Sequence, residues 1–140
     1  MDWHDLLAVP FERGGRTMRG MDCAGVAEEI NARLGHVERG AFHFPIEWTE
    51  ERSGESFEDF MAGAVDRFDY LGDRTEHARE LGDFVVTDPD GKGLGAHITV
   101  LVDQLPRTFI TVMAGRGNVR PVPERALFNV LSVHRVRREA

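Results

Sequence analysis

The chain has 140 residues, of which 17 are basic and 24 acidic, for a net charge of −7. This length suits one domain with a hydrophobic core, and 41% hydrophobic and 29% charged residues are typical of a folded globular protein. We therefore predict a single domain over residues 1–140. The acidic balance disfavours non-specific binding to nucleic acid or anionic surfaces. No apolar run approaches the ~20 residues of a membrane span, and no basic-then-apolar export signal begins the chain, so we expect neither.

The first half of the chain predicts helices. A short helix is expected over Trp3–Val9, closed by Pro10, and a second over Asp22–Leu34, with Asp22 as N-cap and apolar residues at helical spacing. A third is expected from Ser56 to Phe68, where aromatic residues fall on one face. The pattern of residues 36–53 does not decide between an extended segment and a loop. The charged stretch 69–80 is expected to be a solvated connection or a short helix.

The last third changes to the period of strands. Strands are expected over Phe84–Thr87, His97–Val102, Thr108–Ala114 and Leu131–Val136, with a turn at residues 88–91. Helices followed by antiparallel strands predict an α+β domain.

The only cysteine, Cys23, stands where a glycine-rich approach ends and the second helix begins. Unpaired N–H groups and the helix dipole at this position favour a thiolate, and the same N–H groups can hold an oxyanion. A lone cysteine forms neither an internal disulfide nor a thiolate metal site. The alternative is that Cys23 is a small buried hydrophobic residue.

A thiol nucleophile needs a base, and His97 is the best placed of the six histidines because it opens a strand after small residues. The other five are expected to be structural or surface groups. No zinc-binding spacing, Walker-type loop or dinucleotide fingerprint occurs, so we expect no metal and no cofactor.

Four segments in order carry a resemblance to a known family: Val9-Pro10-Phe11-Glu12-Arg13-Gly14-Gly15, Gly20-Met21-Asp22-Cys23-Ala24-Gly25-Val26, Leu81-Gly82-Asp83-Phe84-Val85-Val86 and Ala96-His97-Ile98-Thr99-Val100. Together they resemble the NlpC/P60 family of cysteine peptidases. The resemblance implies a papain-like α+β fold, with N-terminal helices packed on a small antiparallel sheet. It also implies that Cys23 is the nucleophile and His97 its base.

Two positions depart from the family pattern. Phe11 stands where the family has a tyrosine whose hydroxyl helps at the oxyanion site, and Met113 falls where a third polar residue orients the base. Thr111, two residues back and so on the same strand face, is the nearest polar substitute. Asp22 and Thr111 are therefore the auxiliary candidates beside the Cys23 and His97 pair.

The resemblance implies a peptidase that cleaves peptide bonds in peptidoglycan stem peptides. The short acidic chain is similar to domains carried in the tails of phages and gene-transfer particles, made in the host cytoplasm, with other tail-tip or hub proteins as partners. One alternative is a catalytically weak or inactive tail-tip subunit, in which residues 42–48 or Arg135–Arg138 serve assembly. Another is an amidase or acyltransferase acting on a non-wall substrate.

Overall fold

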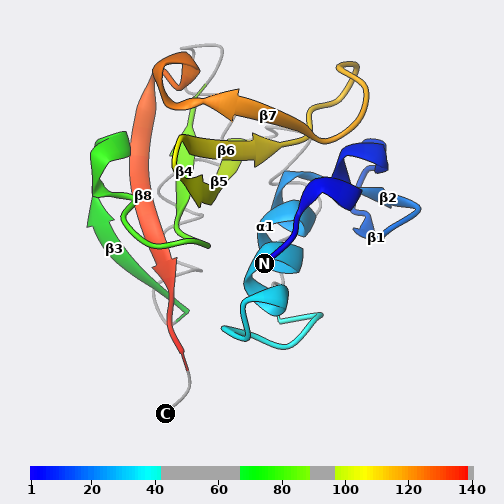
Figure 1. The fold of residues 1–140 in the computed structure, drawn as a ribbon, viewed down its shortest axis with the longest axis horizontal. Coiled ribbons are helices and arrows are strands. Elements are labelled where there is room, and N and C mark those ends of the chain that lie inside the picture. The colour runs from blue at the N-terminus through cyan, green and yellow to red at the C-terminus, as the bar shows by residue number, and fades with distance from the viewer. Residues whose placement is uncertain (42–66, 89–96, 139–140) are drawn as a thin grey trace, which may run out of the picture.

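The computed structural model describes residues 1–41, 67–88 and 97–138, and these form one α-helix and two antiparallel sheets (Figure 1). A hairpin of β1 (Arg16–Thr17) and β2 (Gly20–Met21) precedes the helix α1 (Cys23–Arg33). The large sheet has six strands in the order β3-β8-β4-β5-β6-β7, every neighbouring pair antiparallel. Its strands are β3 (Phe68–Gly72), β4 (Phe84–Thr87), β5 (His97–Gln104), β6 (Arg107–Thr111), β7 (Arg120–Pro123) and β8 (Val130–Val136).

The expected papain-like arrangement, N-terminal helices packed on a small antiparallel sheet, is wrong. The described part of the chain is mostly β, with one α-helix against a six-stranded sheet. The segment expected as Trp3–Val9 is a short 3-10 helix of five residues, His4–Ala8, which adds no helical layer. The sheet gains two edge strands, β3 and β7, because extended backbone at an edge needs only one paired neighbour and tolerates the polar residues and prolines found there.

Several local predictions are confirmed. The helix predicted over Asp22–Leu34 is α1, and the strands predicted at Phe84, His97 and Leu131 are β4, β5 and β8. The expected helix of residues 56–68 and the turn of residues 88–91 lie mostly outside the described residues, although Phe68 itself begins β3. None of the described helices is both long and apolar enough to cross a membrane.

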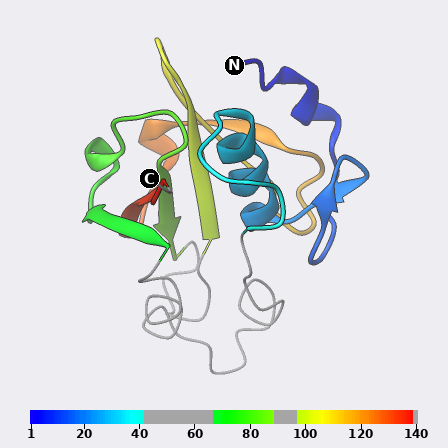
Figure 2. The same cartoon turned by 90° about the horizontal axis from the view of Figure 1, so that it is seen from below.

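Helix α1 lies between the small hairpin and the large sheet. Asp22 begins it as N-cap, with its Oδ1 accepting a hydrogen bond of 2.7 Å from Gly25 N–H. Gly35, at φ +79°, follows the C-terminal end in a conformation that glycine adopts without strain. The helix runs beside β5 (Figure 2), and alternate residues of β5 from Ile98 onward face α1.

The sheet has an apolar cluster on each face. The face toward α1 contributes alternate residues of β5 (Ile98, Val100 and Val102), which pack with Cys23, Val26 and Ile30 of the helix. The opposite face carries Val85, Leu101, Phe109 and Val133, covered by the chain around Ala78 and Leu127. Because β5 is buried from both sides, the sheet holds its first residues in a fixed place.

Candidate active site

Close backbone contacts bring the glycine-rich approach onto the start of α1. The N–H of Asp22 donates to the carbonyl oxygen of Gly15 at 3.3 Å, and a Cβ added to Gly25 would lie 2.5 Å from that oxygen. Arg16 reaches from the hairpin to the Asp22 carboxylate and to the Gly15 carbonyl. The glycines therefore allow a packing that places the Cys23 side chain beneath the hairpin and against the sheet.

The N–H groups at the start of α1 differ in what they bind within the described residues. A helix leaves its first four N–H groups without intrahelical partners. Here the Asp22 N–H donates to Gly15 and the Gly25 N–H to the Asp22 side chain, and Val26 makes the first intrahelical bond, to the Asp22 carbonyl. Of the other two, the Ala24 N–H hydrogen-bonds to the Cys23 sulfur, and the Cys23 N–H has no acceptor among the described residues. They lie where an oxyanion formed next to the Cys23 sulfur would accept hydrogen bonds.

The thiol of Cys23 is protonated in the resting structure. Its side chain is buried, with 6% of its surface exposed, and burial raises the pKa of Cys23 to about 12, with the Asp22 carboxylate adding to the rise. The N–H groups of Ile98 and Ala24 and the charge of Arg16 act in the opposite direction and are outweighed. The sequence-based expectation of a thiolate at the start of the helix is therefore not met, because desolvation exceeds the helix-end effect.

Asp22 carries the negative charge that acts on the Cys23 thiol. Its Oδ1 pairs with Arg16 and caps the helix, whereas its Oδ2 is buried and has no hydrogen-bond partner among the described residues. A buried carboxylate oxygen without a donor is costly, and its field opposes formation of a second anion on the adjacent thiol. Asp22 therefore organises the helix start and disfavours the thiolate.

His97 opens β5 and is held by Thr111 of β6. The two side chains meet at 2.7 Å between His97 Nε2 and Thr111 Oγ1, and the same hydroxyl donates to the Ile98 carbonyl at 2.8 Å. A threonine hydroxyl has one proton, so if it donates to Ile98 it must accept from Nε2–H. This bonding assigns the imidazole the tautomer protonated on Nε2, with a lone pair on Nδ1 that can receive a proton.

The imidazole is neutral at rest. Burial and then the charge of Arg120 lower the pKa of His97 to about 4. The thiol and the imidazole do not hydrogen-bond to each other within the described structure. The link between them is the Ile98 N–H, which faces the sulfur and belongs to the peptide group that joins Ile98 to His97. Cys23 and His97 thus both lie near the start of β5 but on opposite faces of the sheet. Cys23 packs with Ile98, whereas His97 shares its face with Leu101, and its partner Thr111 shares the face of Phe109.

The two positions that depart from the family pattern differ in their structural consequences. Met113 does not take the place of a third polar residue: its sulfur lies 3.8 Å from Arg120 Nη2, and Thr111 contacts His97 instead. Phe11 is partly buried against the main core cluster and offers no side-chain donor.

Sequence reasoning missed Arg16 and Arg120, because pairing across hairpins and neighbouring strands brings them to the site and no spacing motif marks them.

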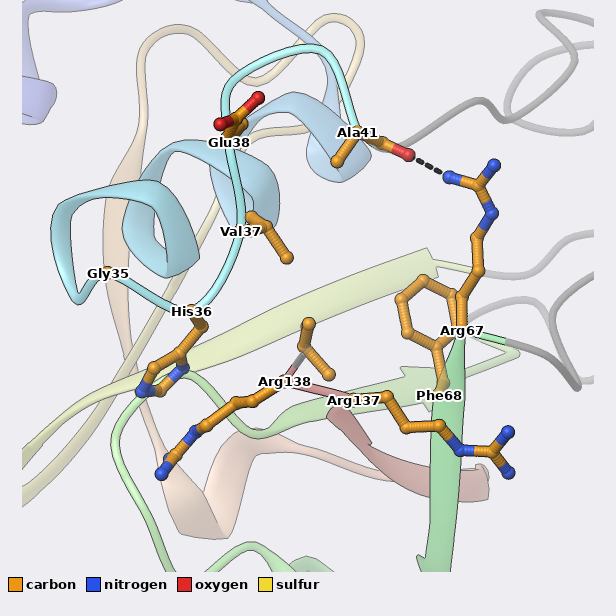
Figure 3. Close-up of a pocket in the computed structure, with 10 residues that line it drawn as sticks. Gly35, His36, Val37, Glu38, Ala41, Arg67, Phe68, Arg137 and Arg138 are labelled. Atoms are coloured by element: carbon orange, nitrogen blue, oxygen red, sulfur yellow. Dashed lines mark hydrogen bonds between the residues drawn. The ribbon is translucent and has the colours of Figure 1, made fainter. Parts of the chain in front are cut away.

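A separate cavity of about 820 Å³ lies on the described surface away from these residues (Figure 3). Its described wall comes from the loop after α1, β3 and the end of β8: Gly35, His36, Val37, Glu38, Ala41, Arg67, Phe68, Val136, Arg137 and Arg138. Figure 3 shows Val37 and Phe68 on its inner side with the arginine side chains around them. None of the predicted site residues lines it, so it is not the thiol site.

Comparisons with known proteins add no assignment. No protein-family model matches the chain, and no curated protein matches its sequence.

Proposed function

We propose that the protein is a cysteine peptidase of the NlpC/P60 kind that cleaves amide bonds in peptidoglycan stem peptides. The observation that supports this most is the hydrogen bond between Thr111 and His97 at the start of β5, next to Ile98, whose N–H hydrogen-bonds to the Cys23 sulfur at the start of α1. A nucleophile, an oriented base and oxyanion donors are the components that acyl transfer requires. The substrate class comes from the four motif segments that resemble the family, not from the fold.

The chemistry starts from neutral groups. Burial raises the pKa of Cys23 to about 12 and lowers the pKa of His97 to about 4, so the resting site holds a thiol and a neutral imidazole and not a thiolate–imidazolium pair. His97 Nδ1 therefore acts as a general base that takes the thiol proton while the sulfur attacks the amide carbonyl. Catalytic hydrogen bonds that are absent or long in a free enzyme often form in the substrate complex, and the Cys23–His97 contact is of this kind in the proposal.

The remaining steps use the same groups. The carbonyl oxygen becomes an oxyanion that accepts hydrogen bonds from the Cys23 and Ala24 N–H groups. When the tetrahedral intermediate collapses, the C–N bond breaks and Nδ1–H returns its proton to the leaving amine, which leaves a thioester on Cys23. Water then attacks the thioester with His97 again as base, releasing the carboxylic acid and restoring the thiol.

The setting of this activity is proposed from the same resemblance. The protein would work in the tail of a phage or gene-transfer particle, held by neighbouring tail-tip or hub proteins, and open the wall during DNA injection.

The test is digestion of purified peptidoglycan, with the released fragments identified by liquid chromatography and mass spectrometry. Wild-type protein is expected to release fragments with new amino termini, and the Cys23→Ala and His97→Ala variants are expected to release none above background. Folding of each variant is checked by circular dichroism. Equal product from wild type and Cys23→Ala, or no product from a folded wild-type protein, would overturn the proposal.

A second candidate is a structural tail-tip subunit with little or no catalysis. The neutral, non-bonded state of Cys23 and His97 favours it. The expected assembly contacts of the basic carboxyl-terminal run receive less support, because Arg135 pairs with Asp83, Arg137 with Asp69 and Arg138 with Glu80 inside the chain. Under this candidate, folded wild-type protein and Cys23→Ala assemble equally well and neither digests peptidoglycan.

A further inference from the structure

Arg16 of β1 joins the small hairpin to the start of α1, although no sequence motif marks it. Its Nη1 donates to the Gly15 carbonyl at 2.9 Å and pairs with Oδ1 of Asp22, the residue that caps the helix. Its Nε lies 3.8 Å from Oε2 of Glu28, further along α1. Only 25% of the Arg16 side chain is exposed. Three acceptors therefore hold the guanidinium in one place beside the first turns of the helix.

The two carboxylates that face Arg16 are buried. The side chains of Asp22 and Glu28 are 2% and 4% exposed, so water screens their charge poorly. Arg33 lies at the other end of α1, about 15 Å along the axis from Cys23. Arg33 is also engaged in other ion pairs. The hairpin thus brings to the start of α1 a positive charge that the helix itself does not supply there.

The thiol of Cys23 lies in the field of these opposing charges. The Asp22 carboxylate raises the pKa of Cys23 beyond the effect of burial, and the charge of Arg16 lowers it. The elements around the thiol carry Asp22 and Glu28 on α1, Arg16 on the hairpin and, on the opposite face of β5, the neutral His97. Without the guanidinium, the buried carboxylates would oppose a second anion at the sulfur more strongly.

We propose that Arg16 is a positioning residue for the nucleophile: its guanidinium, fixed against Asp22, offsets the buried negative charge so that the Cys23 thiol can lose its proton. In the proposed reaction this proton passes to His97 Nδ1 while the S–C bond forms, and the negative charge on the sulfur is highest at that point. No hydrogen bond joins Arg16 to the sulfur within the described structure, so the effect is electrostatic. The inference rests on the proposed function for its catalytic meaning, but the reactivity of the thiol is measurable without any peptidase activity.

The first experiment measures how fast iodoacetamide alkylates Cys23 at one pH below the midpoint of the thiol, where the rate follows the thiolate fraction. The single cysteine makes mass spectrometry of the intact protein a direct readout. Arg16→Gln should react about tenfold more slowly than wild type, as removal of one unit charge from a partly buried setting predicts. Arg16→Lys keeps the charge and should stay within about twofold of wild type. Arg19→Gln, which removes an exposed charge from the same hairpin, should leave the rate unchanged.

A double variant separates charge from packing. Asp22→Asn combined with Arg16→Gln removes one charge of each sign and leaves no carboxylate at residue 22 without its partner. It should react about tenfold more slowly than Asp22→Asn alone and within about threefold of wild type. An ion pair that only fastened the hairpin to the helix predicts the opposite sign, because a loosened protein exposes the thiol and Arg16→Gln would then react faster. Circular dichroism checks each fold, and if Arg16→Gln alone does not fold, the double variant decides.

The outcomes distinguish this inference from the peptidase activity. Folded Arg16→Gln that reacts as fast as wild type or faster overturns the inference, as does a double variant no slower than Asp22→Asn. The expected rates without any hydrolysis of peptidoglycan support the role of Arg16 at the thiol and count against the peptidase. If stem peptides are cleaved, Arg16→Gln should lower kcat about tenfold and leave KM unchanged. No alkylation of Cys23 in folded wild type overturns both.

Discussion

Replacing Thr111 by valine tests how the base is oriented. The substitution keeps the branched shape of the side chain but removes the oxygen that lies 2.7 Å from His97 Nε2 and 2.8 Å from the Ile98 carbonyl. One neutral hydrogen bond is worth about 1 kcal/mol, so loss of the preferred tautomer and ring position should lower kcat about fivefold. The buried Ile98 carbonyl and the Nε2–H also lose a partner, which should lower the free energy of unfolding by about 1–3 kcal/mol.

The assay separates orientation from stability. Urea unfolding gives the stability, steady-state peptide hydrolysis gives kcat, and ¹⁵N NMR shifts of His97 report which ring nitrogen carries the proton. Thr111→Ser should retain the tautomer and most of the rate. Thr108→Val, which removes a hydroxyl bonded to the Pro106 carbonyl on the same strand, should lose some stability without changing the His97 shifts. A Thr111→Val protein with unaltered His97 shifts and unaltered kcat would refute the reasoning.

Two further predictions concern titration. Asp22→Asn keeps a good N-cap but removes the negative charge that raises the pKa of Cys23, so the pH at which the thiol reacts with iodoacetamide should move downward; an unmoved or raised midpoint would contradict this. Burial lowers the pKa of His134 to about 4, whereas the pKa of an unfolded histidine is about 6.5. The folded protein therefore holds His134 neutral, and this contribution to stability is complete above pH 6.5 and is lost as the pH falls toward 4. Urea unfolding between pH 7 and pH 4 should show that the free energy of unfolding falls less in His134→Phe than in wild type, by up to about 3 kcal/mol. The exposed control His4→Gln should lose as much as wild type. Equal losses in all three proteins would contradict the assignment.

Local signals predicted the parts of the fold that depend on local physics. The Asp22 cap and the apolar spacing after it predicted α1, and the runs that begin at Phe84 and His97 predicted β4 and β5. The two edge strands of the large sheet, β3 and β7, were not predicted from the sequence. The polar, charged segment that includes Phe68–Gly72 resembles a connection, and Arg120–Pro123 contains two prolines. Both are extended because β8 and β6 offer them an unpaired edge, which no local pattern records.

The candidate site was likewise predictable from the sequence only in part. Strand alternation was enough to select Thr111 as the polar residue nearest the base, and the structure places its oxygen at hydrogen-bond distance from His97. Its catalytic role stays a prediction. The protonation states could not be predicted, because the burial of Cys23 by the hairpin and the sheet is a tertiary effect that exceeds the local influence of the helix start. The position of Arg120 depends likewise on the pairing of β6 with β7.

The most direct test of the central claim, that Cys23 is a nucleophile served by His97, is to trap the acyl-enzyme. Protein mixed with peptidoglycan stem peptides is quenched in acid within the first turnover and weighed intact, and the modified peptide is then sequenced. The account predicts a thioester adduct on Cys23 in wild type, slower formation in His97→Ala and none in Cys23→Ala. Hydrolysis of the peptides without any adduct on Cys23, or with Cys23→Ala still active, would contradict it.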